Sequence, residues 1–113
     1  MRTLNVKTIV LYLMQTDGKE YVATGRVQKL FVYIYHALAE RDVLRDYDIA
    51  FDASYYTLTH AIMDNSRVFT LDEGNDRICL RTGVKLSALL RENKLDGSVQ
   101  TLIKQFVQKE QEA

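Results

Sequence analysis

The longest periodic run of hydrophobic residues lies between residues 24 and 40. Its apolar positions follow the 3.6-residue period, which places them on one face of a helix. The stripe consists of Val27, Leu30, Phe31, Ile34, Tyr35 and Leu38. Thr24 stands where an N-cap side chain is needed. The pattern predicts a central core helix that Thr24 caps.

A shorter helix and a short strand are predicted before this central helix. Asn5 or Thr3 is placed to cap the helix, and the pair Asp17-Gly18 ends it. Its apolar stripe consists of Val6, Ile9, Val10 and Leu13. Residues 20–23 (EYVA) are too few for a helix and are expected to form a single strand or bridge.

Residues 54–81 predict a short helix followed by a β-hairpin. The helix carries one apolar face and follows two candidate caps, Asp52 and Ser54. That face consists of Tyr55, Leu58, Ala61 and Ile62. Alternation of period two predicts strands at residues 68–71 and 77–81. Residues 72–76 form the turn, in which Gly74 and Asn75 tolerate positive φ.

Two further helices are predicted after the hairpin. Gly83 breaks the chain, and residues 84–93 form a short helix whose inward residues are Leu86, Leu89 and Leu90. Ser98 is placed to cap the last helix, whose apolar stripe consists of Val99, Leu102, Ile103, Phe106 and Val107. The polar, acidic stretch 42–52 between the central helix and the third helix is expected to be a loop.

The element order of residues 24–81, helices followed by a strand-turn-strand wing, resembles the winged-helix superfamily. The expected fold is therefore mainly α with a small β-hairpin (α+β), with a winged-helix-like three-helix core and wing in residues 3–82. Residues 84–110 are expected to be a C-terminal helical extension. No shift in composition divides the chain, so residues 1–113 are expected to be a single domain. The resemblance implies DNA binding in transcription or replication, with protein–protein docking as a common variant.

A second resemblance concerns residues 24–37. The segment Val27-Gln28-Lys29-Leu30-Phe31, followed by Tyr33, is similar to the LQKLLYY segment of SocA-like (Panacea) antitoxin and phage-protein domains. The chain has no proline and no tryptophan, so the Trp-and-Gly-Pro stretch of that family is absent. This resemblance implies a protein-interaction module.

Composition narrows the classes of function. The 15 basic and 15 acidic residues give zero net charge, which does not indicate a strongly basic nucleic-acid binder. Cys79 is the only cysteine, so an intramolecular disulfide is impossible and a reducing, cytoplasmic compartment is expected. The apolar run 9–14 is too short to span a membrane and lacks the cleavage pattern of a signal peptide. No membrane association is expected.

No catalytic, cofactor or metal site is predicted. His36, His60 and Cys79 fall on different elements, and the five glycines are isolated from one another. An EF-hand loop counted from Asp46 would need glycine at its sixth position and glutamate at its twelfth. Those positions hold Phe51 and Thr57. The aspartates of this stretch are expected to be solvated or to cap helices.

The candidate DNA site combines the outward face of the third helix with cations near the hairpin. The helix offers hydroxyl and imidazole groups to base edges, whereas the cations would contact the phosphate backbone. The candidate residues are Tyr56, Thr57, Thr59, His60, Arg67, Arg77, Arg81 and Lys85. Arg91 and Lys94 extend the positive charge along the sequence, whereas Asp72, Glu73 and Asp76 make the turn acidic. Phosphates would repel those three carboxylates.

Protein association is the competing prediction. The chain has seven tyrosines, a residue type enriched at interfaces, and four of them cannot all fit into one core. These four are Tyr33, Tyr47, Tyr55 and Tyr56. The last amphipathic helix is expected to cover its apolar stripe either with the domain or with a second copy in a homodimer.

Overall fold

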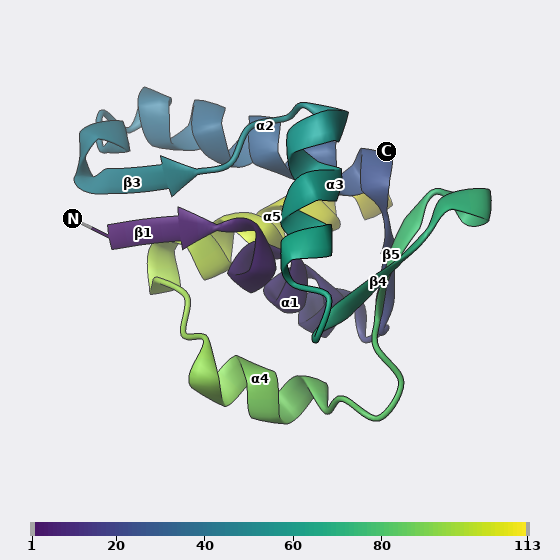
Figure 1. Cartoon of the computed structure of the whole chain (residues 1–113). Helices are drawn as coiled ribbons and strands as arrows, with labels where there is room; N and C mark the ends of the chain where they lie inside the picture. Colours follow the sequence, from purple (N-terminus) through teal and green to yellow (C-terminus); the bar gives the residue numbers. More distant parts are fainter. Residues whose placement is uncertain (1, 113) are drawn as a thin grey trace.

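The computed structural model describes residues 2–112, which form a mixed α+β fold dominated by helices (Figure 1). The α-helices are α1 (Val6–Asp17), α2 (Thr24–Glu40), α3 (Tyr55–Asp64), α4 (Leu86–Glu92) and α5 (Gly97–Glu112). The strands are β1 (Arg2–Asn5), β2 (Tyr21–Ala23), β3 (Tyr47–Ala50), β4 (Phe69–Asp72) and β5 (Arg77–Leu80). Two short 3₁₀ turns, η1 (Leu44–Asp46) and η2 (Glu73–Asn75), precede β3 and β5.

The predicted central helix is present as α2, and its apolar stripe is buried with one exception. Val27, Leu30 and Ile34 are fully buried, whereas Tyr35 is 48% exposed, so its inclusion in the stripe was wrong. Thr24 does not cap the helix: the N-cap is Ala23, which makes no side-chain hydrogen bond. The Thr24 side chain is instead buried and bonded to the hairpin.

The hairpin belongs to a three-stranded antiparallel sheet in the order β2-β5-β4. Phe69 pairs with Leu80, and Val22 of the short predicted strand pairs with Ile78, so apolar residues of all three strands share the buried side. The turn differs from the prediction, because the residue at positive φ is Asp76 rather than Gly74 or Asn75. An aspartate tolerates this conformation better than most residues with a Cβ.

A second, parallel sheet was not predicted. β1 pairs with β3, and the register places Leu4 beside Ile49. The stretch 42–52 therefore contains a 3₁₀ turn and a strand, and its prediction as a loop was wrong. Arg2 of β1 and Tyr47 of β3 both bond to Asp96, which lies just before α5.

Helix α5 belongs to the core of the molecule. It packs against α1 and α2, and all five residues of its predicted stripe are buried in the single chain. That stripe is not available for a homodimer. Arg26 of α2 adds two ion pairs, one to Asp17 of α1 and one to Glu110 of α5. Ser98 lies inside α5 and is not its cap, since the helix begins at Gly97.

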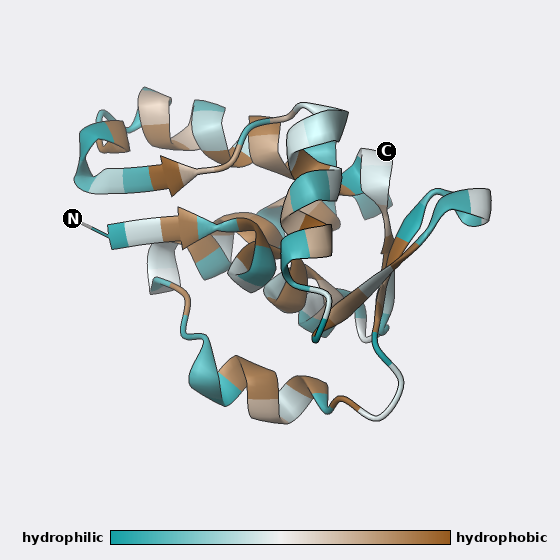
Figure 2. Cartoon of the chain, viewed as in Figure 1, coloured by the Kyte–Doolittle hydropathy of each residue, from teal (hydrophilic) through white to brown (hydrophobic). Residues whose placement is uncertain are grey.

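Helix α4 is less deeply buried than α5. None of its residues is fully buried, and Leu86, Leu89 and Leu90 are half-buried against the core. Figure 2 colours part of α4 hydrophobic, like parts of the helices in the body, whereas the hairpin tip is mostly hydrophilic. α4 is thus an outlying helix, at one side of the β4–β5 hairpin base (Figure 1).

Within residues 2–112, no helix combines the length and apolar character needed to cross a membrane.

Candidate nucleic-acid interface

The α3 helix presents fewer of the predicted base-contacting residues than expected. Thr59 is buried and its hydroxyl donates to the Tyr56 carbonyl, so its prediction as an outward residue was wrong. Thr57 takes part in the helix cap: its N–H donates to the Ser54 hydroxyl and its own hydroxyl donates to Asp52. Both hydroxyl groups are occupied by local bonds, so neither is directed at a ligand.

Tyr56 and His60 remain on the outward face of α3. Tyr56 is 70% exposed, and its ring lies 4.2 Å from the imidazole of His60, centroid to centroid. Met63 is exposed one turn further along, and Asp64 ends the helix. This face is aromatic and ends in a carboxylate, without an Arg, Lys, Asn or Gln side chain for bidentate base contacts.

Two of the four predicted cations lie at the base of the hairpin, and a third lies between the hairpin and α4. Arg67 precedes β4 and is exposed, and Lys85 follows β5 and is exposed. Arg81 lies next to Arg67, because its Nε donates to the Ser66 carbonyl at 2.6 Å and its N–H donates to the Val68 carbonyl. The structure therefore brings Arg67 and Arg81 to one end of the sheet, and Lys85 lies beyond this end, at the start of α4.

Arg77 lies at the other end of β5 and has a structural role there. Its Nε donates to Asp72 at 3.2 Å, and its guanidinium lies 5.0 Å from the centre of the Tyr21 ring. Hydrogen bonds from Asn75 and from Arg77 hold the pKa of Asp72 below its usual value. Arg77 thus stabilises the turn, and it does not join the cations at the hairpin base.

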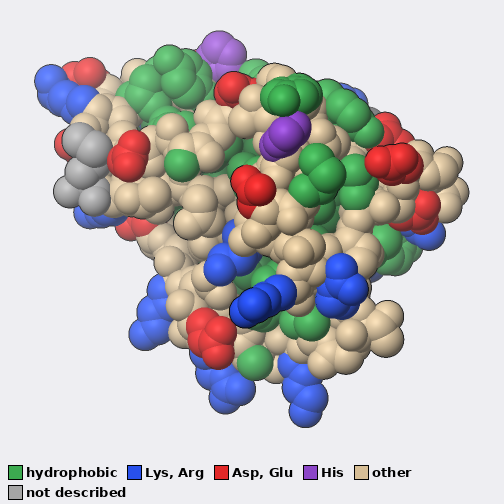
Figure 3. Space-filling model, viewed as in Figure 1, with side chains coloured by type: hydrophobic (Ala, Val, Ile, Leu, Met, Phe, Trp, Pro, Cys, Tyr) green, Lys and Arg blue, Asp and Glu red, His purple; other side chains and the backbone are tan. Residues whose placement is uncertain are grey.

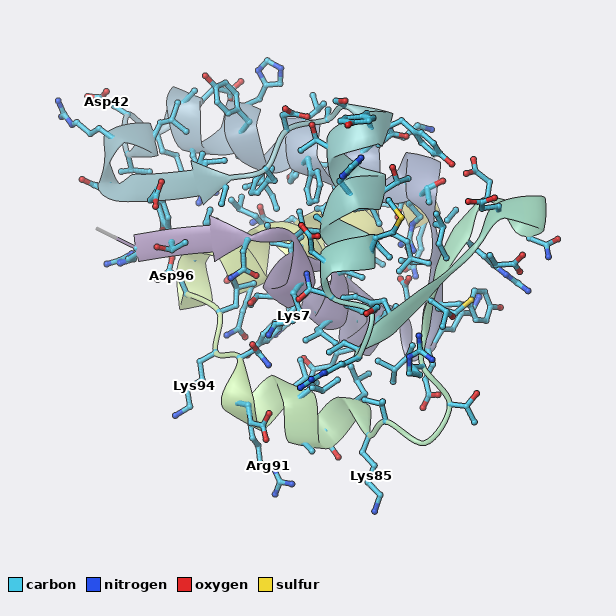
Figure 4. The ribbon with its side chains drawn as sticks, in the orientation of Figure 1. Lys7, Asp42, Lys85, Arg91, Lys94 and Asp96 are labelled. Carbon is cyan, nitrogen blue, oxygen red and sulfur yellow. The ribbon has the colours of Figure 1, made fainter. Side chains whose placement is uncertain are left out.

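Three further cations complete one positive surface. Lys7 of α1 lines a hollow together with Asp64 and Asn65 at the end of α3, next in sequence to Arg67. Arg91 and Lys94 extend outward from the end of α4, on the same side as Lys85 (Figure 4). We call the six residues Lys7, Arg67, Arg81, Lys85, Arg91 and Lys94 the basic face. Figure 3 shows basic side chains gathered below the centre of this view, with few acidic ones among them.

No cation of the basic face forms a salt bridge within residues 2–112. Across the described part of the chain, the salt bridges join Arg2, Arg26, Arg45 and Arg77 to carboxylates, and none involves the basic face. Most acidic residues lie elsewhere, at the hairpin tip, along the stretch 42–52 and around α5, although Asp64 lies beside Lys7 and Glu92 stands between Arg91 and Lys94 in the sequence. A chain of zero net charge therefore has a strongly uneven charge distribution.

Lys7 could not have been found from the sequence, because it stands alone in an apolar helix about 60 residues before Arg67. Arg91 and Lys94 could be found from the sequence, since they continue the run of cations that starts at Arg67.

Residues 2–112 contain no group of three or more His, Cys, Asp or Glu side chains placed to hold a metal ion. Cys79 is half-buried in the middle of the sheet.

Comparison with known proteins adds no relative. No family model matches the chain, and no match was found among curated proteins or solved structures.

Proposed function

We propose that this protein binds duplex DNA through the basic face, as a small regulator of transcription or replication. The proposal is supported by the six cations of the basic face, none of which forms a salt bridge within residues 2–112. Duplex DNA carries a regular row of phosphates, and a protein that neutralises several of them gains affinity by releasing counterions. A cluster of six cations on one face meets this requirement even though the whole chain is neutral.

The arrangement of the elements supports the same proposal. A strand between the first two helices joins the hairpin, and α3 leads directly into it, which resembles the element order of winged-helix proteins. In such proteins the third helix and the wing lie near the DNA. The basic face includes Arg67, in the link from α3 to β4, and Arg81 at the base of the hairpin, so it lies where these two elements meet.

The contacts proposed are mainly to phosphates. Cations on flexible side chains position a protein on DNA without selecting its sequence, whereas base selection needs side chains that reach base edges. Of the predicted base-contacting set, only Tyr56 and His60 are free on α3. We therefore expect binding with little sequence preference and a DNA affinity that depends strongly on salt.

The proposal assigns no catalytic role to any residue. It places the protein in the cytoplasm, where the lone thiol of Cys79 would remain reduced.

The test is a fluorescence-anisotropy titration of a labelled random-sequence duplex at several salt concentrations. Six phosphate contacts predict that log K falls with log salt with a slope of about −5. Replacing Lys85, Arg91 and Lys94 together with alanine should reduce this slope by about three and weaken binding at least about tenfold at 100 mM salt. All three side chains are exposed, so folding should be unaffected.

A matched control replaces two lysines and one arginine outside the basic face. Lys29, Arg41 and Lys104 are exposed and have the same composition as the tested set. Their replacement with alanine should leave the slope within about one unit of the native value, since they contact no phosphate in the proposed complex. Absence of binding by the native protein at 20 mM salt, or equal losses in both triple variants, would overturn the proposal.

Protein docking is a second candidate, favoured by a different observation. Six large hydrophobic side chains are exposed in residues 2–112, and five of them lie on the outer faces of α2 and α3. These five are Val32, Tyr35, Tyr55, Tyr56 and Met63. Exposed apolar side chains that gather on adjoining elements are typical of an interaction surface.

A further inference from the structure

A groove lies between α2 and the chain that runs from β3 to α3. Its volume is about 440 Å³, and its lining is mostly apolar. The lining includes Phe31, Ile49 and Phe51, and the rings of Phe31 and Phe51 stack with their centroids 4.3 Å apart. Val32 and Tyr35 of α2 form one wall. A bulky apolar side chain entering this groove would be removed from water by side chains of two elements.

The wall formed by α2 is exposed although it is apolar. Val32 is 43% exposed and Tyr35 is 48% exposed, and both lie outside the buried stripe of α2. In Figure 3 hydrophobic side chains are gathered in the upper half of the view, away from the basic ones. Burying these two side chains and the groove under a partner would therefore be favourable.

One edge of β3 adjoins this groove. Among the described strands β3 pairs only with β1, and it lies between β1 and α2 (Figure 1). Ile49 of β3, together with Phe51 just after it, lines the groove. An edge strand presents unpaired backbone N–H and C=O groups, which an added extended chain can pair with. The groove thus favours an extended peptide over a helix, because a helix has no free backbone groups for the edge.

One carboxylate lines the groove, and two more lie in or directly before β3. Asp46, Asp48 and Asp52 are exposed, and none of them forms a salt bridge within residues 2–112. Asp52 also lines the groove, where it accepts hydrogen bonds from the Ser54 N–H and the Thr57 hydroxyl. Basic side chains in the partner would complement these charges, whereas a nucleic acid would be repelled.

We propose that this groove is the docking site for an extended segment of a partner protein. The segment adds to the free edge of β3, places a large aliphatic or aromatic side chain between Val32 and Phe51, and carries Lys or Arg at flanking positions. The groove shares no residue with the basic face, so either site can fail its test without affecting the other.

The first experiment selects ligands from a phage-displayed library of random nine-residue peptides on the immobilised 113-residue chain. Enriched peptides should carry at least one large apolar residue flanked by basic residues, in agreement with the groove and its aspartates. Selection that enriches no peptide above a bare-support control, or that enriches acidic peptides, would overturn the proposal.

The second experiment tests the site with paired variants. Val32→Arg places a charged side chain in the groove, and Ala39→Arg places the same charge on an exposed position of the same helix, outside the groove. The selected peptide should bind Val32→Arg at least about tenfold more weakly than the native chain and should bind Ala39→Arg within about twofold. Equal affinities for the two variants would place the peptide elsewhere and overturn the assignment.

The third experiment tests the extended conformation. N-methylation at alternate positions of the selected peptide removes its backbone donors on one edge without changing its side chains. One of the two alternating N-methylated peptides should lose at least about tenfold in affinity, and the other should retain its affinity, because only one edge pairs with β3. Amide shifts in ¹H–¹⁵N spectra should be concentrated at residues 47–53. Full affinity in both methylated peptides would exclude strand addition.

Discussion

At the residue scale, Thr24 connects the start of α2 to the hairpin turn. Its side chain is completely buried, and its hydroxyl lies 2.6 Å from an Asp76 carboxylate oxygen and 3.0 Å from the Asp76 carbonyl. Its backbone N–H also donates to that carbonyl. Asp76 is the residue at positive φ, so these bonds hold the hairpin turn against the first turn of α2.

Replacing Thr24 with valine keeps the shape of the side chain and removes the hydroxyl donor. We expect the free energy of unfolding to fall by about 1–3 kcal/mol, since a hydrogen bond to a charged group is lost. Thr24→Ser keeps the donor and loses one methyl group, so it should cost only about 1 kcal/mol. Urea denaturation followed by circular dichroism measures both values. A valine variant as stable as the native chain would show that the bond makes no net contribution.

Thr24 also shows why single residues are harder to predict than patterns. A threonine before a helical stripe is a plausible cap, and nothing in the local sequence indicates a partner 52 residues away. Thr59 was misplaced for a similar reason, because helical spacing left it outside the apolar stripe although it is buried. The stripes of α2 and α5 were predictable since their periodicity is local and continuous.

At the scale of elements, the two C-terminal helices differ in how they contribute to stability. Leu102 of α5 is fully buried, whereas Leu90 of α4 is half-buried. Leu102→Ala should lower the free energy of unfolding by about 2–5 kcal/mol, because it leaves a cavity between packed helices. Leu90→Ala should cost less than about 1.5 kcal/mol, since part of that side chain already contacts water.

Urea melts of the two alanine variants provide the measurement, and the identical chemical change makes each the control for the other. Similar losses in both would mean that α4 is as firmly packed as α5.

The hairpin and α5 could be predicted from the sequence, but the pairing of β1 with β3 could not. Each of these strands has four residues, and the pairing joins segments about 45 residues apart, so no local pattern marks it.

At the scale of the whole molecule, the charge distribution determines where a polyanion can bind. The basic face draws on α1, the hairpin base and the region around α4, so no window of the sequence displays it. The zero net charge of the chain did not predict this face, because most of the balancing carboxylates lie in other regions. The acidic hairpin tip projects from the body (Figure 1), at the opposite end of the β4–β5 hairpin from Arg67 and Arg81.

The position of the hairpin tip relative to bound DNA can be tested with two charge reversals. Glu73 lies in the tip, and Glu92 stands between Arg91 and Lys94 of the basic face. Both side chains are exposed. Each of the variants Glu73→Lys and Glu92→Lys replaces a negative charge with a positive one. Asp72 and Asp76 are unsuitable for this purpose, since they bond to Arg77 and Thr24.

The two variants should respond differently to salt. A four-residue strand spans about 13 Å, which exceeds the screening length of about 8 Å at 0.15 M salt. Glu92→Lys should therefore increase the affinity for random duplex at both 10 mM and 150 mM salt, whereas Glu73→Lys should increase it only at 10 mM, where screening extends over about 30 Å. Anisotropy titrations at the two salt concentrations give the comparison. If Glu73→Lys increased the affinity at 150 mM salt as much as Glu92→Lys, the hairpin tip would lie against the phosphates. DNA would then contact the hairpin along its length rather than at its base.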